Sequence, residues 1–401
     1  MNPRPLRLGV VLSHPTQYYS PWFRSLQAGR PAGALRVFYL WDFGVTRQRD
    51  PNFQTTFQWD VDLLSGYESE FVPNRARRPG PEHFWGFRNP GLPGRLRAWR
   101  PEALLLFGYP WASHLRALVW ARRRGVPVLF RGDSHFLGRG APDWRRRLLL
   151  GALYRQMSAF LYTGRANRAY FETLGVPARK LHFAPHAVDQ ELFAPSAPGH
   201  RERAAALRRQ LGLADSTCVV LAAGKLIAAK QPRELLAAFR ALDLPGSALV
   251  FVGEGEEKPA LLAEAARARP GSVHFLPFAN QSEMPSRYLL ADIFALPSRG
   301  CYETWGLAVN EAMHMGVPCL VSDLVGCQQD LVSQGETGWV FAADSPEGLR
   351  RALAEAVVDS RPGADRERIR RAVAGRIAGY TYSQTTAGLE AALASLLPSR
   401  P

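Results

Sequence analysis

Short hydrophobic runs alternate with longer, partly polar segments through the first half of the chain. Five runs have the length and composition of buried strands: Arg7–Ser13, Leu35–Leu40, Ala103–Phe107, Val126–Phe130 and Ala159–Tyr162. Trp111–Arg124 and Asp143–Gln156 lie between such runs and have the pattern of helices. Strands that alternate with helices are typical of a parallel sheet covered on both faces, so we expect one α/β unit here.

The second half repeats this pattern after a linker at Pro185–His200. It predicts strands at Val219–Ala223, Ala248–Val252, Val273–Leu276, Ile293–Leu296 and Pro318–Ser322, and helices at Arg233–Leu242, Glu257–Ala268, Glu311–Met315 and Ser383–Leu397. Residues 73–100 interrupt the alternation and are rich in Pro, Gly and Arg, which fits a functional loop or a disordered insertion. The sequence therefore predicts an α/β protein with two Rossmann-like, doubly wound domains, whose strand ends face a common cleft.

The composition, with 46% hydrophobic and 21% charged residues, is that of a globular protein. No apolar stretch approaches the ~18 to 20 residues that span a bilayer, and the run Leu8–Leu12 is too short for the core of a signal peptide. We therefore expect a cytoplasmic protein. Cys218, Cys301, Cys319 and Cys327 form no CxxC pair, so buried thiols are expected rather than disulfide bonds or metal ligands.

Positive charge is concentrated in the first half. Residues 1–185 contain 28 Lys and Arg against 11 Asp and Glu, a net charge of +17, whereas residues 186–401 contain 22 against 24. This asymmetry indicates an anionic partner, such as an anionic acceptor or membrane surface. Trp144 and Leu148 lie beside Arg145–Arg147, which fits either an interfacial membrane helix or a packed helix with a solvated basic edge. The signatures of RNA-binding modules are missing, so no nucleic acid partner is expected.

Two glutamates in the segment Pro297–Asp323 are the most informative polar residues. Glu303 follows a predicted strand, and Glu311 lies eight residues later. A helix start near Gly306 would offer free backbone N–H groups to a phosphate. A carboxylate suits a vicinal diol because it can accept two hydroxyl protons. The alternative is a pair of solvated helix glutamates.

A pair of lysines and a glycine turn follow two of the predicted strands. Lys225 and Lys230 come after the strand Val219–Ala223, where two cations could either face a diphosphate or lie in solvent. Gly253 and Gly255 follow the next strand and indicate a tight turn. Neither the lysine pair nor the glycine turn is specific alone. The interpretation of this region rests on the order in which they precede the two glutamates along the chain.

That order resembles a known family. The succession GKL…K, FVGEGEE, VHFLPFANQSEMPSRYLLADIFALPS, ETWGLAVNEAMHMGVPCLVSD and GETGWVF, within about Pro185 to Ala343, is similar to the donor domain of retaining GT-B glycosyltransferases of the large family commonly numbered four, the glycosyl transferases group 1. The resemblance implies domains at 1–185 for the acceptor and 186–375 for the donor, with a C-terminal helix in 376–401 that crosses back to the first domain. It implies sugar transfer from a nucleotide sugar, by default a UDP- or GDP-sugar, with retention and without a metal or other cofactor.

The resemblance also implies roles for individual residues. Glu311 would bind the donor ribose, and Glu303 would contact the transferred sugar. Lys225, where the family usually has Arg, and Lys230 would neutralise the diphosphate. The remaining donor contacts would come from Phe278 and its neighbours at the base, and from the backbone of Trp305, Gly306 and Leu307.

The first half matches the family only in general layout. The family's glycine-rich loop after the first strand is replaced by His14-Pro15-Thr16-Gln17-Tyr18-Tyr19, so His14 and Gln17 are predicted to face the acceptor, or else the loop is capped with buried tyrosines. The family often has a histidine at a later strand end, which maps to His135 as a catalytic residue, with Asp133 as the nearby alternative. Asp133 or Ser134 as the N-cap of the next helix is the competing interpretation.

Two further hypotheses complete the prediction. Asp60-Val61-Asp62 matches the DxD metal motif of another glycosyltransferase class, but three residues match easily by chance, so we predict no metal there.

The expected product is a glycan, polysaccharide or glycolipid, with an anionic or lipid-linked acceptor. A non-catalytic scaffold that binds nucleotide sugars or glycans is the alternative function, and the presence of both lysines and both glutamates favours the enzyme.

Overall fold

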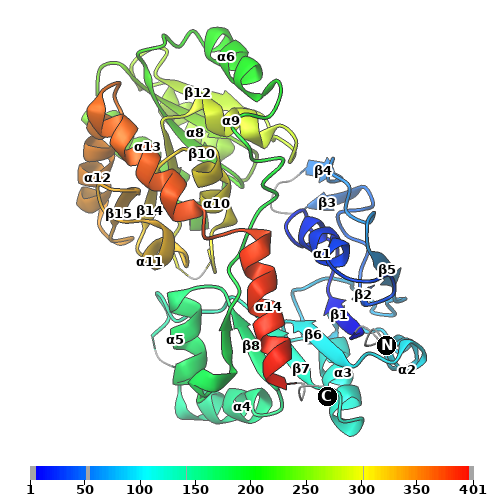
Figure 1. The fold of residues 1–401 in the computed structure, drawn as a ribbon. Coiled ribbons are helices and arrows are strands. Elements are labelled where there is room, and N and C mark those ends of the chain that lie inside the picture. The colour runs from blue at the N-terminus through cyan, green and yellow to red at the C-terminus, as the bar shows by residue number, and fades with distance from the viewer. Residues whose placement is uncertain (1–5, 51–54, 141, 301, 397–401) are drawn as a thin grey trace.

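Two parallel sheets organise the chain. The computed structural model describes residues 6–50, 55–140, 142–300 and 302–396, so Cys301 lies outside the described residues. Each sheet forms a lobe with its helices, and one lobe lies above the other (Figure 1). The chain thus has the two doubly wound α/β units that the alternating pattern predicts.

The N-terminal sheet has the strand order β5-β2-β1-β6-β7-β8-β9, and all its pairs are parallel. Its strands are β1 (Leu8–Leu12), β2 (Leu35–Tyr39), β5 (Glu68–Phe71), β6 (Ala103–Phe107), β7 (Val128–Arg131), β8 (Ala159–Tyr162) and β9 (Leu181–Phe183). Leu104 and Leu106 belong to one hydrophobic core, while Leu105 and Phe107 belong to the other. Both faces of the sheet are therefore covered, which explains why β6 is apolar at every position.

The C-terminal sheet has the order β12-β11-β10-β13-β14-β15, again with parallel pairs. Its strands are β10 (Cys218–Ala223), β11 (Ser247–Val252), β12 (Val273–Leu276), β13 (Ile293–Leu296), β14 (Cys319–Ser322) and β15 (Gly338–Phe341). Val220 lies opposite Leu249 of β11 and Ile293 of β13. Cys218, Cys319 and Cys327 are buried free thiols in this lobe, as expected.

Helices cover both sheets. In the N-terminal lobe they are α1 (Tyr19–Ala28), α2 (Leu92–Trp99), α3 (Ala112–Arg123), α4 (Trp144–Tyr154) and α5 (Arg165–Thr173). The C-terminal lobe has α6 (His200–Gln210), α7 (Pro232–Leu242), α8 (Lys258–Ala265), α9 (Met284–Leu290), α10 (Leu307–His314), α11 (Gln328–Leu331), α12 (Pro346–Asp359) and α13 (Ala364–Ile377). An antiparallel hairpin, β3 (Gln48–Asp50) with β4 (Thr55–Phe57), lies on the side of the lower lobe nearest the upper one (Figure 1).

The last helix, α14 (Tyr382–Leu396), returns from the upper lobe and runs beside β8 of the lower lobe (Figure 1). The Trp22 indole donates a hydrogen bond to the Thr386 hydroxyl (3.0 Å), and the Tyr382 hydroxyl donates to the Tyr18 carbonyl (2.9 Å). A Cβ at Gly388 would lie 2.0 Å from the Phe183 carbonyl oxygen, so the close approach to β9 requires glycine. The predicted crossing of the C-terminal helix is confirmed.

The predicted strands agree with the observed ones to within two residues, but the interpretation of residues 73–100 was wrong in part. Residues 92–99 are helix α2 rather than part of an irregular segment, and the buried Leu92, Leu96 and Trp99 give it an apolar face. Pro93 lies in the first turn of α2, where a missing N–H costs nothing, so it did not prevent the helix. The helix start expected near Gly306 is confirmed, because α10 begins at Leu307 with Gly306 as its N-cap, so the range Glu311–Met315 covered only the second part of this helix.

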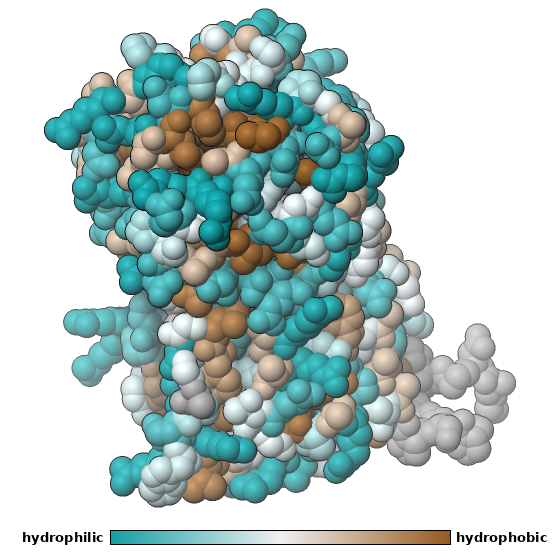
Figure 2. All heavy atoms as spheres, turned by 90° about the vertical axis from the view of Figure 1, so that its left-hand side faces the viewer, coloured by the Kyte–Doolittle hydropathy of each residue, from teal (hydrophilic) through white to brown (hydrophobic). Residues whose placement is uncertain are grey.

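The outer surface is mixed in character. On the side of the molecule in Figure 2, small hydrophobic patches are separated by hydrophilic side chains. In the described part of the chain, no helix combines the length and apolarity that a membrane span needs.

Candidate functional site

A cavity of about 350 Å³ lies between the lobes and collects most of the predicted donor residues. It is lined from the C-terminal lobe by Lys225, Lys230, Phe278, Glu303 and Glu311, and from the N-terminal lobe by Gln17, Tyr18, Phe43 and Trp59 among others. The cavity adjoins the carboxyl ends of β10 and β11, because Ala223 and Val252 also line it. Ligands of open α/β sheets bind at this edge.

Two glycine turns form the floor at these strand ends. Gly224 has φ +132° and Gly253 has φ +138°, which side chains rarely adopt. A Cβ at Gly253 would lie 2.0 Å from the Gly224 carbonyl oxygen, so the two turns touch through their backbones. The glycines therefore let the turns pack directly against each other, with Lys225 immediately after one of them.

Lys230 and Glu303 form an ion pair in the cavity wall. Lys230 ends a 3-10 helix at Ala228–Lys230, and its Nζ lies 2.7 Å from the Glu303 Oε1. The side chains are only 18% and 14% exposed. A pair with so little water contact leaves an unpaired buried charge when either partner is removed. The structure thus brings together one predicted diphosphate ligand and one predicted sugar ligand.

Glu311 is held in the second turn of α10, and its side chain is buried. The Tyr288 hydroxyl donates to Oε2 (2.7 Å), and the Gln281 amide donates to Oε1 (3.0 Å). Burial raises the pKa of Glu311, and these two hydrogen bonds oppose the rise. The Tyr18 hydroxyl of the N-terminal lobe also acts on this carboxylate and lowers its pKa. A carboxylate has about four lone-pair sites, so Glu311 can accept a further donor beside these three. Sequence analysis missed Gln281 and Tyr288, which the fold brings to Glu311 from α9 and the loop before it.

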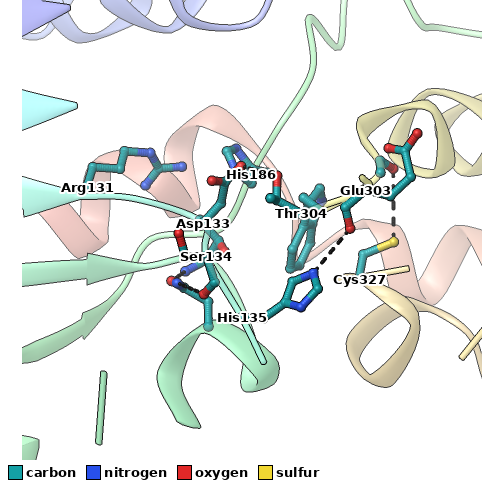
Figure 3. A network of polar contacts seen from close by, with 12 residues as sticks. Arg131, Asp133, Ser134, His135, His186, Glu303, Thr304 and Cys327 are labelled. Carbon is teal, nitrogen blue, oxygen red and sulfur yellow. Dashed lines mark hydrogen bonds and ion pairs between the residues drawn. The ribbon is translucent and has the colours of Figure 1, made fainter. Parts of the chain in front are cut away.

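A second cluster joins the loop after β7 to the loop that carries Glu303 (Figure 3). The His135 ring points to the Glu303 backbone carbonyl, with 3.2 Å between Nε2 and the oxygen, while the Glu303 carboxylate points away from His135. The Leu137 N–H donates to His135 Nδ1 (3.1 Å), so Nε2 carries the proton and donates to the Glu303 carbonyl. Burial lowers the pKa of His135, which favours this neutral form.

Asp133 lies beside His135 and contacts the same loop. The Thr304 hydroxyl donates to Asp133 Oδ2 (2.8 Å), and His186 Nε2 lies 3.6 Å from that oxygen, beyond hydrogen-bond distance. Burial works to raise the pKa of Asp133, but His186 and the Thr304 hydroxyl outweigh it and lower the pKa to about 2. Asp133 is therefore an anion at neutral pH, and its side chain remains 40% exposed.

Two residues of this cluster had no sequence signal. Burial lowers the pKa of His186, which lies in the linker between the lobes, so it is neutral beside Asp133 at neutral pH. Asp330 of α11 accepts the backbone N–H of Arg165 at the start of α5, at 3.0 and 3.2 Å from its two oxygens. Asp330 thus caps a helix of the opposite lobe.

The competing N-cap interpretation for Asp133 and Ser134 was wrong. Helix α4 begins ten residues after Ser134, and its N-cap is Asp143, whose side chain accepts from the Arg146 N–H (2.8 Å). Asp133 does not have that role, because residues 132–140 contain a turn but no helix, and its carboxylate instead contacts Thr304.

The remaining predicted residues fall into two groups. Gln17 is buried and lines the cavity, whereas His14 is not among the lining residues. The His14 ring packs edge-on against Phe43, 5.4 Å between centroids, and burial lowers the pKa of His14 to about 4. Trp305, Gly306 and Leu307 lie at the start of α10 and are not among the lining residues, and their predicted backbone contacts stay a prediction.

The two carboxylates of the DxD motif make separate contacts. Asp60 accepts from the backbone N–H of Ser282 (3.2 Å) and from its hydroxyl, in the opposite lobe. Asp62 accepts from the N–H groups of Leu64 and Ser65 in its own turn. Among the described residues, no three His, Cys, Asp or Glu side chains gather as a metal site would require.

Comparison with known proteins finds a family model and relatives that are similar to parts of this chain. Residues 204–375 match the family model described as glycosyl transferases group 1. The chain is 30% identical over 211 residues to the GDP-mannose-dependent alpha-(1-6)-phosphatidylinositol monomannoside mannosyltransferase of Mycolicibacterium smegmatis, covering 51% of this chain and 54% of that protein. It is 27% identical over 351 residues to the D-inositol 3-phosphate glycosyltransferase of Stackebrandtia nassauensis, covering 79% of this chain and 76% of that protein.

Several of these matches are partial. The chain spans about half the length of the mycolicibacterial relative and 41% of the D-inositol 3-phosphate glycosyltransferase of Corynebacterium urealyticum.

The similarity in fold covers more of the chain than the similarity in sequence. The crystal structure of Anabaena Alr3699/HepE in complex with UDP and glucose superposes with a TM-score of 0.71 at 17% identity, covering 97% of this chain and 100% of that one. Together with the two parallel sheets and the crossing helix, these similarities show that the chain has the GT-B fold and that its residues 204–375 match the glycosyl transferases group 1 family model.

Proposed function

We propose that the protein is a glycosyltransferase that moves a sugar from a nucleotide-sugar donor to an acceptor hydroxyl with retention of configuration. The observation that carries this proposal is one cavity, at the carboxyl ends of the C-terminal strands, that holds Lys225, Lys230, Glu303 and Glu311 together. The donor is a UDP- or GDP-sugar, supported by the GDP-mannose named for one relative and the UDP bound to one structural neighbour.

The two lysines stabilise the departing diphosphate. In the reaction, the bond between the sugar anomeric carbon and the diphosphate oxygen breaks, and its electron pair leaves with the diphosphate. The acceptor oxygen bonds to the anomeric carbon from the same face, and its proton passes to a diphosphate oxygen. Fixed cations at Lys225 and Lys230 favour the charge that develops, and we propose that they do so without a metal or other cofactor.

Donor binding also changes the partner of Lys230. The diphosphate competes with Glu303 for the ammonium, because both are anions within reach of the same Nζ. Glu303 is then free to accept hydrogen bonds from the hydroxyls of the transferred sugar. Glu311, already oriented by Gln281 and Tyr288, accepts the ribose hydroxyls with its remaining lone pairs.

His135 and Asp133 are not among the residues that line the cavity, but both contact the loop that carries Glu303, and we propose that His135 acts as a positioning residue and that Asp133 contacts a substrate. Both ring nitrogens of His135 are engaged, one of them with the Glu303 carbonyl, so His135 fixes the loop that carries the sugar ligand. Asp133 is ionised and partly exposed, which suits it to accept a hydroxyl of the acceptor or sugar. We assign acceptor binding to residues 1–185, with Gln17 at the cavity, and the diphosphate, ribose and sugar contacts of the donor to residues 186–375.

The acceptor is an anionic or lipid-linked molecule in glycan or glycolipid assembly, and the protein meets it as a cytoplasmic, peripheral membrane protein. Helix α4 supports this, because its Trp144 is 67%, Leu148 60% and Leu149 73% exposed, next to Arg145–Arg147. Exposed apolar side chains flanked by arginines favour an anionic bilayer surface. Sedimentation with vesicles of anionic and of zwitterionic lipids tests this, and Leu148→Ser with Leu149→Ser should reduce binding to the anionic vesicles.

The experiment that tests the function is a thermal-shift panel of UDP-, GDP-, ADP- and dTDP-sugars, with and without EDTA. One nucleotide should stabilise the protein, and EDTA should not change the shift. Absence of any shift would contradict the donor site. Stabilisation without turnover on a panel of acceptors would instead support a non-catalytic binding scaffold.

A further inference from the structure

We propose that the nucleobase of the donor is held against an aromatic wall from the N-terminal lobe, formed by Phe43 and Trp59. The inference rests on the proposed function and specifies which lobe binds which part of the donor. Phe43 and Trp59 line the same cavity as Phe278, Lys230 and Glu311. Aromatic rings bind nucleobases by stacking, which tolerates different bases.

Cross-lobe hydrogen bonds place this wall at the base end of the cavity. The Asn280 side-chain amide donates to the Gln58 carbonyl (2.8 Å), and its oxygen accepts from the Asp60 N–H (3.4 Å). Asp60 in turn accepts from Ser282. Trp59 is thereby tied, through its neighbours on both sides, to the segment that follows Phe278. That segment also provides Gln281, which holds Glu311, so the tether lies next to the proposed ribose site.

Packing within the N-terminal lobe fixes both rings of the wall. The backbone N–H of Trp59 donates to the Gly44 carbonyl (3.2 Å). A Cβ at Gly44, which has φ +88°, would lie 2.9 Å from Trp59 Cδ1, so the indole ring packs directly on the Gly44 backbone. Phe43 stacks on Trp41 with 4.7 Å between ring centroids and 25° between ring planes. The wall is therefore preorganised and needs little ordering when a base arrives.

This arrangement gives Asp60 a role that does not involve a metal. Its carboxylate contacts Ser282 in the opposite lobe, so it holds Trp59 beside the donor lobe. Because the wall belongs to the N-terminal lobe, the nucleotide bridges the two lobes. Binding of the nucleotide is thus expected to depend on a residue outside the matched family domain at 204–375.

Calorimetric titration of the full chain with UDP and with GDP tests the proposal. Trp59→Ala should weaken binding of the preferred nucleotide about 10-fold or more, as expected for one lost stacking contact. Trp59→Phe should restore most of the affinity. Inorganic pyrophosphate, which has no base, should bind the wild-type protein and Trp59→Ala equally. Trp85→Ala is the matched control, because Trp85 is 57% exposed and does not line the cavity.

The outcomes separate this inference from the proposed function. Wild-type affinity in Trp59→Ala, together with loss of binding in Lys230→Ala, would overturn the aromatic wall and leave the donor site in place. No binding of either nucleotide to the wild-type protein would overturn both. If Trp59→Ala does not fold, Phe43→Leu and Asp60→Asn take its place. Phe43→Leu should weaken nucleotide but not pyrophosphate binding, and unchanged nucleotide affinity in both variants would overturn the wall.

Discussion

The two lobes contribute to the site in different ways. The C-terminal lobe supplies side chains that point into the cavity from strand ends and from α10, and Lys230 and Glu303 already form a pair there. The N-terminal lobe supplies residues that mostly hold other residues, as His135 holds the Glu303 backbone and Asp133 holds Thr304. Under the proposed function, the C-terminal lobe carries the chemistry and the N-terminal lobe sets its geometry. Substitutions in the donor lobe should therefore have the larger effects.

The largest effect is expected from Lys230→Ala. Loss of a fixed cation from the leaving diphosphate should lower the transfer rate by about 100- to 1,000-fold, while the circular-dichroism spectrum stays that of the wild-type protein. Lys258→Ala is the matched control, since Lys258 pairs with Glu254 at 2.6 Å and does not line the cavity. Transfer measured with a radiolabelled donor gives the comparison, and similar rates in both variants would refute the role of Lys230.

Glu311→Gln should separate binding from stability. Nucleotide affinity should fall about 10-fold, because neutral acceptors bind hydroxyls more weakly than a carboxylate does. Burial raises the pKa of Glu311 although its hydrogen bonds oppose the rise. Between the ordinary pKa of a glutamate and this raised pKa, the folded protein is therefore protonated at Glu311 while the unfolded chain is ionised there. The ionised group disfavours folding above that window. Glu311→Gln should therefore unfold at the same or a higher temperature at neutral pH.

The same pKa shift predicts a pH dependence of donor binding. Affinity should fall as the pH drops through the raised pKa of Glu311, because the protonated carboxyl accepts ribose hydroxyls less well. The Glu311→Gln variant should lose this dependence. Titration of nucleotide affinity against pH in both proteins is the measurement, and parallel curves would show that another group is responsible.

A smaller effect is expected in the N-terminal lobe from His135→Ala. Under the proposed role of His135 as a positioning residue of the Glu303 loop, kcat should fall about tenfold, with little change in donor KM. His83→Ala serves as the control, since His83 is exposed and makes its contact with the Arg78 carbonyl. A loss as large as that of Lys230→Ala would mean that the histidine takes part in the chemistry itself.

The smallest effect should come from Asp330→Ala at the contact between α11 and α5. Removal of a helix cap costs about 1 kcal/mol of unfolding free energy, and here the cap also joins the lobes. Chemical denaturation measures the change. Transfer rates at low temperature should remain close to those of the wild-type protein, and a catalytic loss without destabilisation would contradict a purely structural role.

The features that can be predicted from the sequence also differ between the two lobes. In the C-terminal lobe, Lys225 and Glu303 follow strands that are recognisable as apolar runs, so their approach at one sheet edge could be predicted. The sequence holds no signal for His186 or Asp330. His186 approaches Asp133, more than 50 positions earlier, and Asp330 contacts Arg165, more than 160 positions earlier, so both contacts exist only in the folded chain. Helix α2 was missed because Pro93 and Gly94 hide a periodic apolar face.

The central claim is that the cavity between the lobes is the donor site. A crystal structure of the protein with its preferred nucleoside diphosphate tests this most directly. The claim predicts diphosphate oxygens within ion-pair distance of Lys225 and Lys230, and ribose hydroxyls on Glu311. A nucleotide bound elsewhere, such as in the larger hollow of about 570 Å³ between α7 and α12, with Lys230 still paired to Glu303, would contradict it.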